Sequence, residues 1–229
     1  MATRRSYDDG CASAHALDLV GERWGLLVVR ELVLGPKRFT DLRTGLPGIS
    51  PNVLTQRLEE LEQASVVRRR KLPPPAAAWV YELTDWGLEL EPVIMALGRW
   101  GARSPLLPQG AAMSVDALIL SFRTMFASEA AAGFAATLEL RFGEDRFHAV
   151  IVEGRMTLDR GPASHPDATL ETDPNTLAAV VYGGQKLADA QRAGSLKVEG
   201  DKGVVKRFLT LFPLPKPALA SYQLAKGIL

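Results

Sequence analysis

The stretch GISPNVLTQRLEELE, residues 48–62, decides how the first half of this chain folds. Ser50 is a residue type that caps helix N-termini, and Pro51 suits the first helical position, where a missing amide hydrogen costs nothing. Apolar residues then recur at helical spacing and predict one buried face. They are Val53 or Leu54, Leu58 and Leu61.

The opposite face of this helix is predicted to be polar, with Asn52, Thr55, Gln56 and Arg57. Side chains of these types can hydrogen-bond base edges and phosphates. A short helix and a Gly-containing turn precede the segment, which is the order that a DNA-reading helix-turn-helix requires. Taken alone, the segment also fits an ordinary amphipathic surface helix.

Basic residues lie on both sides of this candidate recognition helix. Lys37 and Arg38 precede it, and residues 68–71 (RRRK) follow it. Basic clusters often decorate a solvated surface, but phosphate contacts must flank base contacts, so this placement favours DNA binding. The whole chain has 27 Lys and Arg against 26 Asp and Glu, so bulk charge does not support nucleic-acid binding.

The rest of the first half predicts the elements of a winged helix. They are helices at 12–20 and 23–34, a short helix at 39–43, a turn at 45–48, the candidate recognition helix, and strands at 66–70 and 79–83. The segment between the two strands is rich in Pro and Ala. Its prolines exclude both a helix and a central strand, so we expect it to be a loop that joins the strands. Thr84 is expected to cap a further helix with an apolar stripe ending at Trp100, and Pro92 to kink it.

Six motifs occur in order along this half: Cys11, LDLVGERW (17–24), RFTDL (38–42), ISPNVLTQRL (49–58), YELT (81–84) and LGRWG (97–101). Together they resemble the HxlR-type family of bacterial winged-helix regulators over about residues 8–103. The resemblance implies a homodimeric, DNA-binding transcription factor that dimerises through the N- and C-terminal helices of the module. Its recognition helices would occupy successive major grooves of an imperfect inverted repeat.

The wing departs from the family pattern because its tip, residues 72–78, carries no charge. Minor-groove reading by the tip is therefore not expected, and Arg69 and Lys71 at the base of the hairpin are the better phosphate contacts. The predicted DNA contacts are Lys37, Arg38, Ser50, Asn52, Thr55, Gln56, Arg57, Arg69 and Lys71.

Cys11, the single cysteine, allows two interpretations. Some HxlR-type regulators use a cysteine at this position to sense electrophiles or oxidants, so the resemblance makes Cys11 a candidate redox sensor. Asp8 and Asp9 would raise the pKa of its thiol if they lay close in space. An incidental cysteine is the alternative.

The second half follows a linker and has the pattern of an α+β domain. An apolar helical stripe from Val115 to Phe126 comes first. The further expected elements are strands at 134–142, 146–152, 155–159, 168–172 and 196–200, helices at 174–182 and 186–193, and a terminal helix with Val205, Phe208, Leu209 and Phe212. The predicted domains are therefore a winged helix at 1–103, a linker at 104–112 and an α+β domain at 113–229.

Three motifs of this half, DATLETDP (167–174) with Leu177, Gly183-Gly184, and LKVEGD (196–201), resemble the sterol carrier protein domain over roughly residues 115–213. That resemblance implies a fold with an apolar tunnel that binds a hydrophobic ligand. Phe122, Met125, Phe126, Leu138 and Phe208 are the predicted ligand-binding residues. They could equally form the core, because pockets and cores use the same residue types.

Several classes of function lack support in the sequence. One cysteine and three scattered histidines (His15, His148 and His165) predict neither a disulfide framework nor a metal site. The chain has no phosphate-binding glycine loop and no Gly-x-Ser-x-Gly motif, so we expect no cofactor and no enzymatic activity. A secretory signal and a membrane-spanning run are also lacking, which favours the cytoplasm.

Two hypotheses remain from the sequence. The first is a dimeric transcription factor that binds double-stranded DNA and is modulated by a hydrophobic small molecule or lipid in its second half. The second is a lipid or small-molecule carrier in which the winged helix serves dimerisation or protein contacts. The operator, the ligand and the direction of regulation are not encoded in any recognisable motif.

Overall fold

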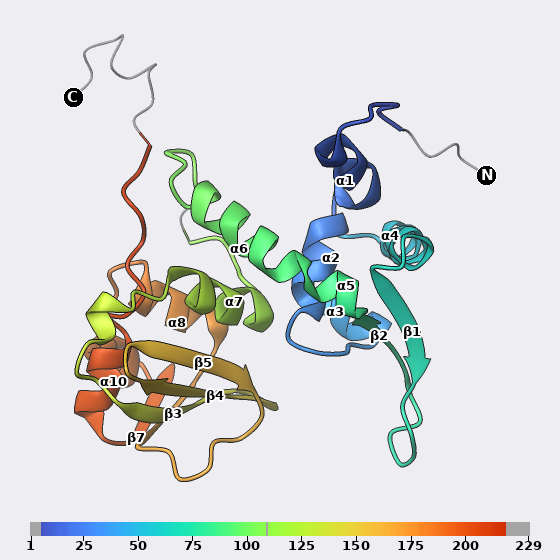
Figure 1. Cartoon of the computed structure of the whole chain (residues 1–229). Helices are drawn as coiled ribbons and strands as arrows, with labels where there is room; N and C mark the ends of the chain where they lie inside the picture. Colours follow the sequence, from blue (N-terminus) through green and yellow to red (C-terminus); the bar gives the residue numbers. More distant parts are fainter. Residues whose placement is uncertain (1–5, 109, 219–229) are drawn as a thin grey trace. The chain divides into compact units, whose positions relative to one another are not determined.

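The computed structural model describes residues 6–108 and 110–218. The chain divides into two compact units, Met1–Ile94 and Met95–Leu229, and the division falls within helix α6, Leu90–Gly101 (Figure 1). A winged helix-turn-helix and a mixed α+β second half are both confirmed. The predicted domain limits at residues 103 and 112 stay a prediction.

The N-terminal unit contains helices and one two-stranded antiparallel sheet. In chain order they are α1 (Ala12–Val20), α2 (Gly25–Leu32), α3 (Phe39–Gly45), α4 (Pro51–Gln63), β1 (Val67–Lys71), β2 (Trp79–Leu83), α5 (Asp85–Leu88) and the start of α6. Helices α3 and α4 form the helix-turn-helix, and β1 and β2 form the wing.

Helix α4 begins where its sequence predicts. The Ser50 hydroxyl accepts a hydrogen bond from the Val53 amide at 3.3 Å, and Pro51 occupies the first turn. Leu54, Leu58 and Leu61 are at most 2% exposed and form its inner face. Burial of each leucine contributes about 2 kcal/mol, so this face holds α4 against the rest of the unit.

The predicted helix after Thr84 is interrupted. Thr84 caps the single turn of α5, and α6 starts two residues after α5 ends. Pro92 therefore lies in the first turn of α6, where the missing amide breaks no helical hydrogen bond. The expected kink takes the form of this interruption, because α5 ends at Leu88, four residues before Pro92.

The C-terminal unit contains a five-stranded sheet with helices. In chain order its elements are α7 (Val115–Met125), a short 3-10 helix (Glu129–Ala131), β3 (Ala136–Phe142), β4 (Asp145–Val152), β5 (Arg155–Arg160), β6 (Ala168–Thr172), α8 (Pro174–Val181), α9 (Leu187–Arg192), β7 (Leu196–Gly200) and α10 (Lys202–Phe208). The strand order is β5-β4-β3-β6-β7, and only the β3–β6 pairing is parallel among the described strands.

The two faces of this sheet differ because side chains alternate along each strand. Leu138, Leu140 and Phe147 are fully buried on one face, and α7 and α8 run across this side in Figure 1. The other face carries polar side chains such as Glu139 and Thr169. The loop that follows β5 passes on this second side (Figure 1).

An aromatic cluster fills the space between the sheet and the helices. The ring of Phe122 stacks on Phe212 with a centroid distance of 4.4 Å and meets Phe208 edge-on at 6.1 Å. The predicted terminal helix ends at Phe208, so Phe212 reaches the cluster from the segment that follows α10. These rings make a dense core at the position where the sequence suggested a ligand.

Candidate nucleic-acid interface

The exposed face of α4 presents short polar side chains. Asn52, Thr55 and Gln56 are all exposed, as the sequence predicts. Ser50 is exposed as well, but its hydroxyl caps the helix and fixes where α4 starts. A helix with three neighbouring hydrogen-bonding side chains on its solvent face has the chemistry that reads base edges in a major groove.

Arg57 lies on the other side of α4 from where the sequence placed it. It belongs to the inner stripe with Leu54, Leu58 and Leu61 and is 8% exposed. Its Nη1 atom lies 2.6 Å from Glu60 Oε2 and 3.6 Å from Glu22 Oε2. The expectation that Arg57 shares the polar face is wrong, because position 57 falls three residues after Leu54 on the buried side.

Lys37 also has a different environment from the expected one. Its ammonium lies 2.8 Å from Glu31 Oε2, and Glu31 is completely buried and also binds Arg30 at 2.9 Å. The backbone of Lys37 pairs with Tyr81 of the wing. Lys37 thus ties α2 to the wing, while Arg38, the next residue, is exposed at the start of α3.

One face of the wing holds two arginines on a buried carboxylate. Arg68 and Arg70 donate to the two oxygens of Glu82 at 2.8 and 2.6 Å, while their side chains stay 63% and 41% exposed. Burial raises the pKa of Glu82, but the hydrogen bonds and charges of both arginines outweigh it and hold the pKa below its ordinary value. Glu82 therefore orients two cations toward solvent.

The opposite face of the wing carries Arg69 and Lys71. The Arg69 guanidinium lies over Trp79 and Tyr81, 4.7 and 5.8 Å from the ring centroids, and Lys71 is exposed. Burial raises the pKa of the Tyr81 hydroxyl above its ordinary value. Glu82, Trp79 and Tyr81 were not predicted, although alternation in WVYEL places 79 and 81 on the face of Arg69.

Cys11 is exposed at the N-cap position of α1. Hydrogen bonds from the backbone amides of Ser13 and Ala14 lower the pKa of its thiol, as expected for a helix N-terminus. Asp9 is close, but its carboxylate accepts the Cys11 amide at 2.9 Å. The predicted rise in the thiol pKa is wrong because the helix amides dominate.

The predicted ligand-binding residues lie in the packed core of the C-terminal unit or at its edge. Phe122, Leu138 and Phe208 are fully buried, and Met125 and Phe126 are partly exposed. This placement matches the alternative that the sequence left open, in which these residues form the core.

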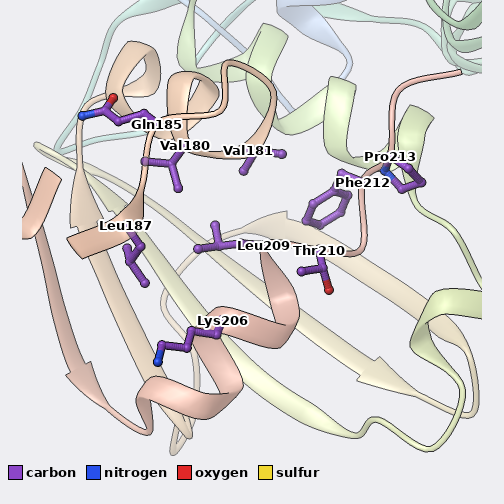
Figure 2. Close-up of a pocket in the computed structure, with 9 residues that line it drawn as sticks. All are labelled: Val180, Val181, Gln185, Leu187, Lys206, Leu209, Thr210, Phe212 and Pro213. Atoms are coloured by element: carbon purple, nitrogen blue, oxygen red, sulfur yellow. The ribbon is translucent and has the colours of Figure 1, made fainter. Parts of the chain in front are cut away.

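An open pocket of about 400 Å³ lies elsewhere in this unit, between the end of α8, the start of α9 and the end of α10 (Figure 2). Six of its nine lining residues are apolar, and Lys206, Gln185 and Thr210 add polar groups. The full lining is Val180, Val181, Gln185, Leu187, Lys206, Leu209, Thr210, Phe212 and Pro213. Sequence signals for this pocket were weak, since its residues come from three segments and have no shared spacing.

Residues 6–108 and 110–218 contain neither a metal-binding cluster nor a membrane-spanning helix. That part of the chain contains no group of three His, Cys, Asp or Glu side chains able to hold a metal ion. None of its helices combines the length and the hydropathy that crossing a membrane requires.

Comparison with known proteins connects the interface to a family. Residues 19–105 match the family described as HxlR-like helix-turn-helix. The "Uncharacterized HTH-type transcriptional regulator YvaP" of Bacillus subtilis (strain 168) is 38% identical over 85 residues, which are 37% of this chain and 79% of YvaP. The chain belongs to the HxlR-like helix-turn-helix family. The "HTH-type transcriptional regulator YodB" of the same organism is 39% identical, over 37% of this chain and 76% of YodB.

The part of the chain beyond the HxlR-like module matches a different family. Residues 109–220 match the family described as alkyl sulfatase C-terminal. A solved structure of the sec-alkyl sulfatase PisA1, a double mutant, is 20% identical with a TM-score of 0.41, over 48% of this chain. The chain spans 17% of the length of that enzyme. The absence of enzymatic activity therefore stays a prediction for this half.

Proposed function

We propose that this protein is a homodimeric transcriptional regulator that binds an inverted-repeat DNA site through α4 and the wing. The observation that carries the proposal is the exposed polar face of α4 next to a wing with four consecutive cations. Membership of the HxlR-like family supports DNA binding as the function. The family and its regulator relatives also favour a cytoplasmic protein.

The proposed contacts are divided by chemistry. Asn52, Thr55 and Gln56 read base edges, while Arg38, Arg69 and Lys71 contact phosphates because they are exposed cations beside α4. Lys37 and Arg57 act indirectly in this proposal, since each is paired with a carboxylate inside the unit.

Dimerisation is supported by apolar residues that remain exposed. Val93, Leu97 and Trp100 of α6 lie on one face of that helix and are 52%, 49% and 74% exposed, and Leu17 of α1 is 49% exposed. Exposed apolar stripes of this kind mark interaction surfaces. Leu97→Glu should convert the dimer to monomer in light scattering, and an unchanged mass would contradict the proposal.

DNA binding can be tested with duplexes from upstream of the protein's own gene and unrelated duplexes of equal length, at physiological salt. The proposal expects preference for the upstream DNA in fluorescence anisotropy. Asn52→Ala should weaken that binding by about 10-fold, the effect of losing one base contact. Gln63→Ala, at the exposed far end of α4, serves as the matched control. Equal binding of both duplexes would reject DNA recognition.

We further propose that the C-terminal unit, a sterol-carrier-like domain, binds a hydrophobic molecule that modulates DNA affinity. The pocket beside α8 and α10 supports this function, and the alkyl sulfatase match suggests an amphiphile with an anionic head. Calorimetric titrations with decyl sulfate and with decanol at equal concentration test this. The two molecules have the same chain length, so any difference in binding comes from the anionic headgroup. Thr210→Trp should fill the pocket and abolish heat release, and Lys206→Met should remove the preference for decyl sulfate.

The same titration distinguishes the regulator from a lipid carrier. A regulator must bind the amphiphile and change its DNA affinity in response, because coupling between two sites is reciprocal. A carrier would bind the amphiphile without any effect on DNA.

Cys11 remains a candidate redox sensor under this proposal, supported by its exposure and the lowered pKa of its thiol. Hydrogen peroxide should then reduce DNA affinity in the native protein and leave Cys11→Ser unchanged.

A further inference from the structure

We infer that Glu60 fixes the orientation of the Gln56 amide and thereby makes Gln56 a selective reader of adenine. The inference rests on the proposed DNA-binding function and adds which base α4 selects at one position. Gln56 Nε2 donates to Glu60 Oε1 at 3.0 Å, one turn along the helix. Gln56 itself is exposed on the face proposed to enter the major groove.

The direction of this hydrogen bond follows from chemistry. An ionised carboxylate has acceptors but no donor, so the Gln56 amide must turn its nitrogen toward Glu60. The reverse orientation would bring two oxygens together and leave Glu60 Oε1 without the Gln56 donor. One amide hydrogen is therefore engaged, and the other hydrogen together with Oε1 remains available for a base.

Adenine is the base that matches this remaining pair of groups. In the major groove it presents N6–H₂ as a donor and N7 as an acceptor, so Gln56 Oε1 can accept from N6 while the second amide hydrogen donates to N7. Guanine presents two acceptors, O6 and N7, which an anchored amide can satisfy only in part. An unanchored glutamine could rotate its amide to suit either purine.

Buried Arg57 explains why a carboxylate can lie beside DNA at this position. Its Nη1 lies 2.6 Å from Glu60 Oε2, so Oε1 binds Gln56 while Oε2 faces a cation. Arg57 is in turn 3.6 Å from Glu22 at the junction of α1 and α2. Arg57 and Glu60 are thus positioning residues that connect the core of the unit to one base-reading side chain.

Selection from a randomised duplex library, with the full chain and sequencing of the bound pool, tests the inference. The native protein should prefer adenine over guanine at one position per half-site, by on the order of 10- to 100-fold as for one bidentate contact. Gln56→Ala should lose that preference. Glu60→Gln should reduce it to within about 3-fold, because an amide neighbour can accept or donate and no longer fixes Gln56.

Glu59→Gln is the matched control, because Glu59 is exposed on the same helix. This substitution removes the same charge but leaves the hydrogen bond between Gln56 and Glu60 intact. It should keep the adenine preference while changing overall affinity as Glu60→Gln does. Circular dichroism melts check that Glu60→Gln remains folded, and Gln56→Ala tests the same position without altering the ion pair.

The results distinguish two failures. A bound pool with no enriched sequence rejects the proposed function and the inference with it. An enriched site whose base preferences do not change in Gln56→Ala, or change equally in Glu59→Gln and Glu60→Gln, overturns the inference alone. A guanine or thymine preference at the Gln56-dependent position also overturns it.

Discussion

The wing and the C-terminal sheet each contain a buried glutamate that binds two arginines. Glu82 binds Arg68 and Arg70, and Glu139 binds Arg141 at 2.6 Å and Arg146 at 3.2 Å. Burial raises the pKa of both carboxyls, and in both the arginine hydrogen bonds outweigh it and lower the pKa. As electrostatic groups, the two clusters are nearly the same.

Their surroundings differ. The second oxygen of Glu139 accepts the Ala163 amide at 2.8 Å, so this cluster also fastens the loop after β5 to the sheet. Both oxygens of Glu82 are used by arginines, whose side chains are 63% and 41% exposed, and Arg69 and Lys71 lie on the reverse face of the same strand. The same ion group therefore stabilises a loop in one unit and arranges surface cations in the other.

The largest expected effect concerns DNA affinity. Arg69→Ala/Lys71→Ala should weaken binding by about 30-fold at 0.15 M salt and reduce the slope of log affinity against log salt by about 2, because two phosphate contacts are lost. Arg141→Ala/Arg146→Ala removes two cations from the other cluster and serves as the control. An equal slope change in both pairs, measured by anisotropy, would show that the clusters do not differ in function.

For folding stability we expect the opposite ranking, with the larger effect at the Glu139 cluster. Glu139→Ala should lower the free energy of unfolding of its unit by about 2–3 kcal/mol, because the Ala163 amide and two arginines lose their acceptor. Glu82→Ala should cost about 1 kcal/mol, since its arginines can turn to water. Hydrogen exchange read separately in residues 110–218 and 6–94 measures both, and a larger effect of Glu82→Ala would contradict this ranking.

Lowering the pH should reduce the folding stability of both units. The folded pKa of each glutamate lies below its ordinary value of 4.5, so the unfolded chain binds more protons as the pH falls. The stabilisation is complete above this value and is lost as the pH falls through the folded pKa. Glu82→Gln and Glu139→Gln should each flatten the loss of stability below pH 4.5 in urea titrations, and unchanged curves would reject the ion pairs as its cause.

The smallest expected effect concerns thermal stability at alkaline pH, where the tyrosines of the two units can be compared. Burial raises the pKa of Tyr182 to about 12, although its hydrogen bond to Ser121 at 3.0 Å opposes the rise. The neutral hydroxyl is favoured in the fold, so this stabilisation is complete below pH 10 and is lost as the pH rises toward 12. Tyr182→Phe should reduce the fall in melting temperature between pH 9 and 11 by a few degrees, whereas Tyr81→Phe should have less effect.

Local sequence predicted the winged helix well because its signals are short-range. Ser50 and Pro51 start α4, leucines at helical spacing bury one face, and hairpin strands flank a proline-rich connector. Arg57 is the exception in this region. A charged residue was assigned to the polar face by its type, while its spacing from Leu54 already indicated the buried side.

Sequence could not separate pocket from core in the second half. Phe122, Leu138 and Phe208 have the residue types of both, and only their complete burial in the fold placed them in the core. The pocket is instead lined by residues from α8, α9, α10 and the segment after α10. Contacts between distant segments leave no periodic pattern in any one of them.

By itself, the sequence determined that this chain has a winged helix followed by an α+β half, and that α4 presents Asn52, Thr55 and Gln56. Caps, turns and periodicity act between residues a few positions apart, so they can be interpreted without the fold. Only the tertiary structure decided which charges are satisfied internally. Glu31 and Glu82 bind cations from other elements, Lys37 in one case and Arg68 with Arg70 in the other, and those pairings determine which basic side chains remain for DNA.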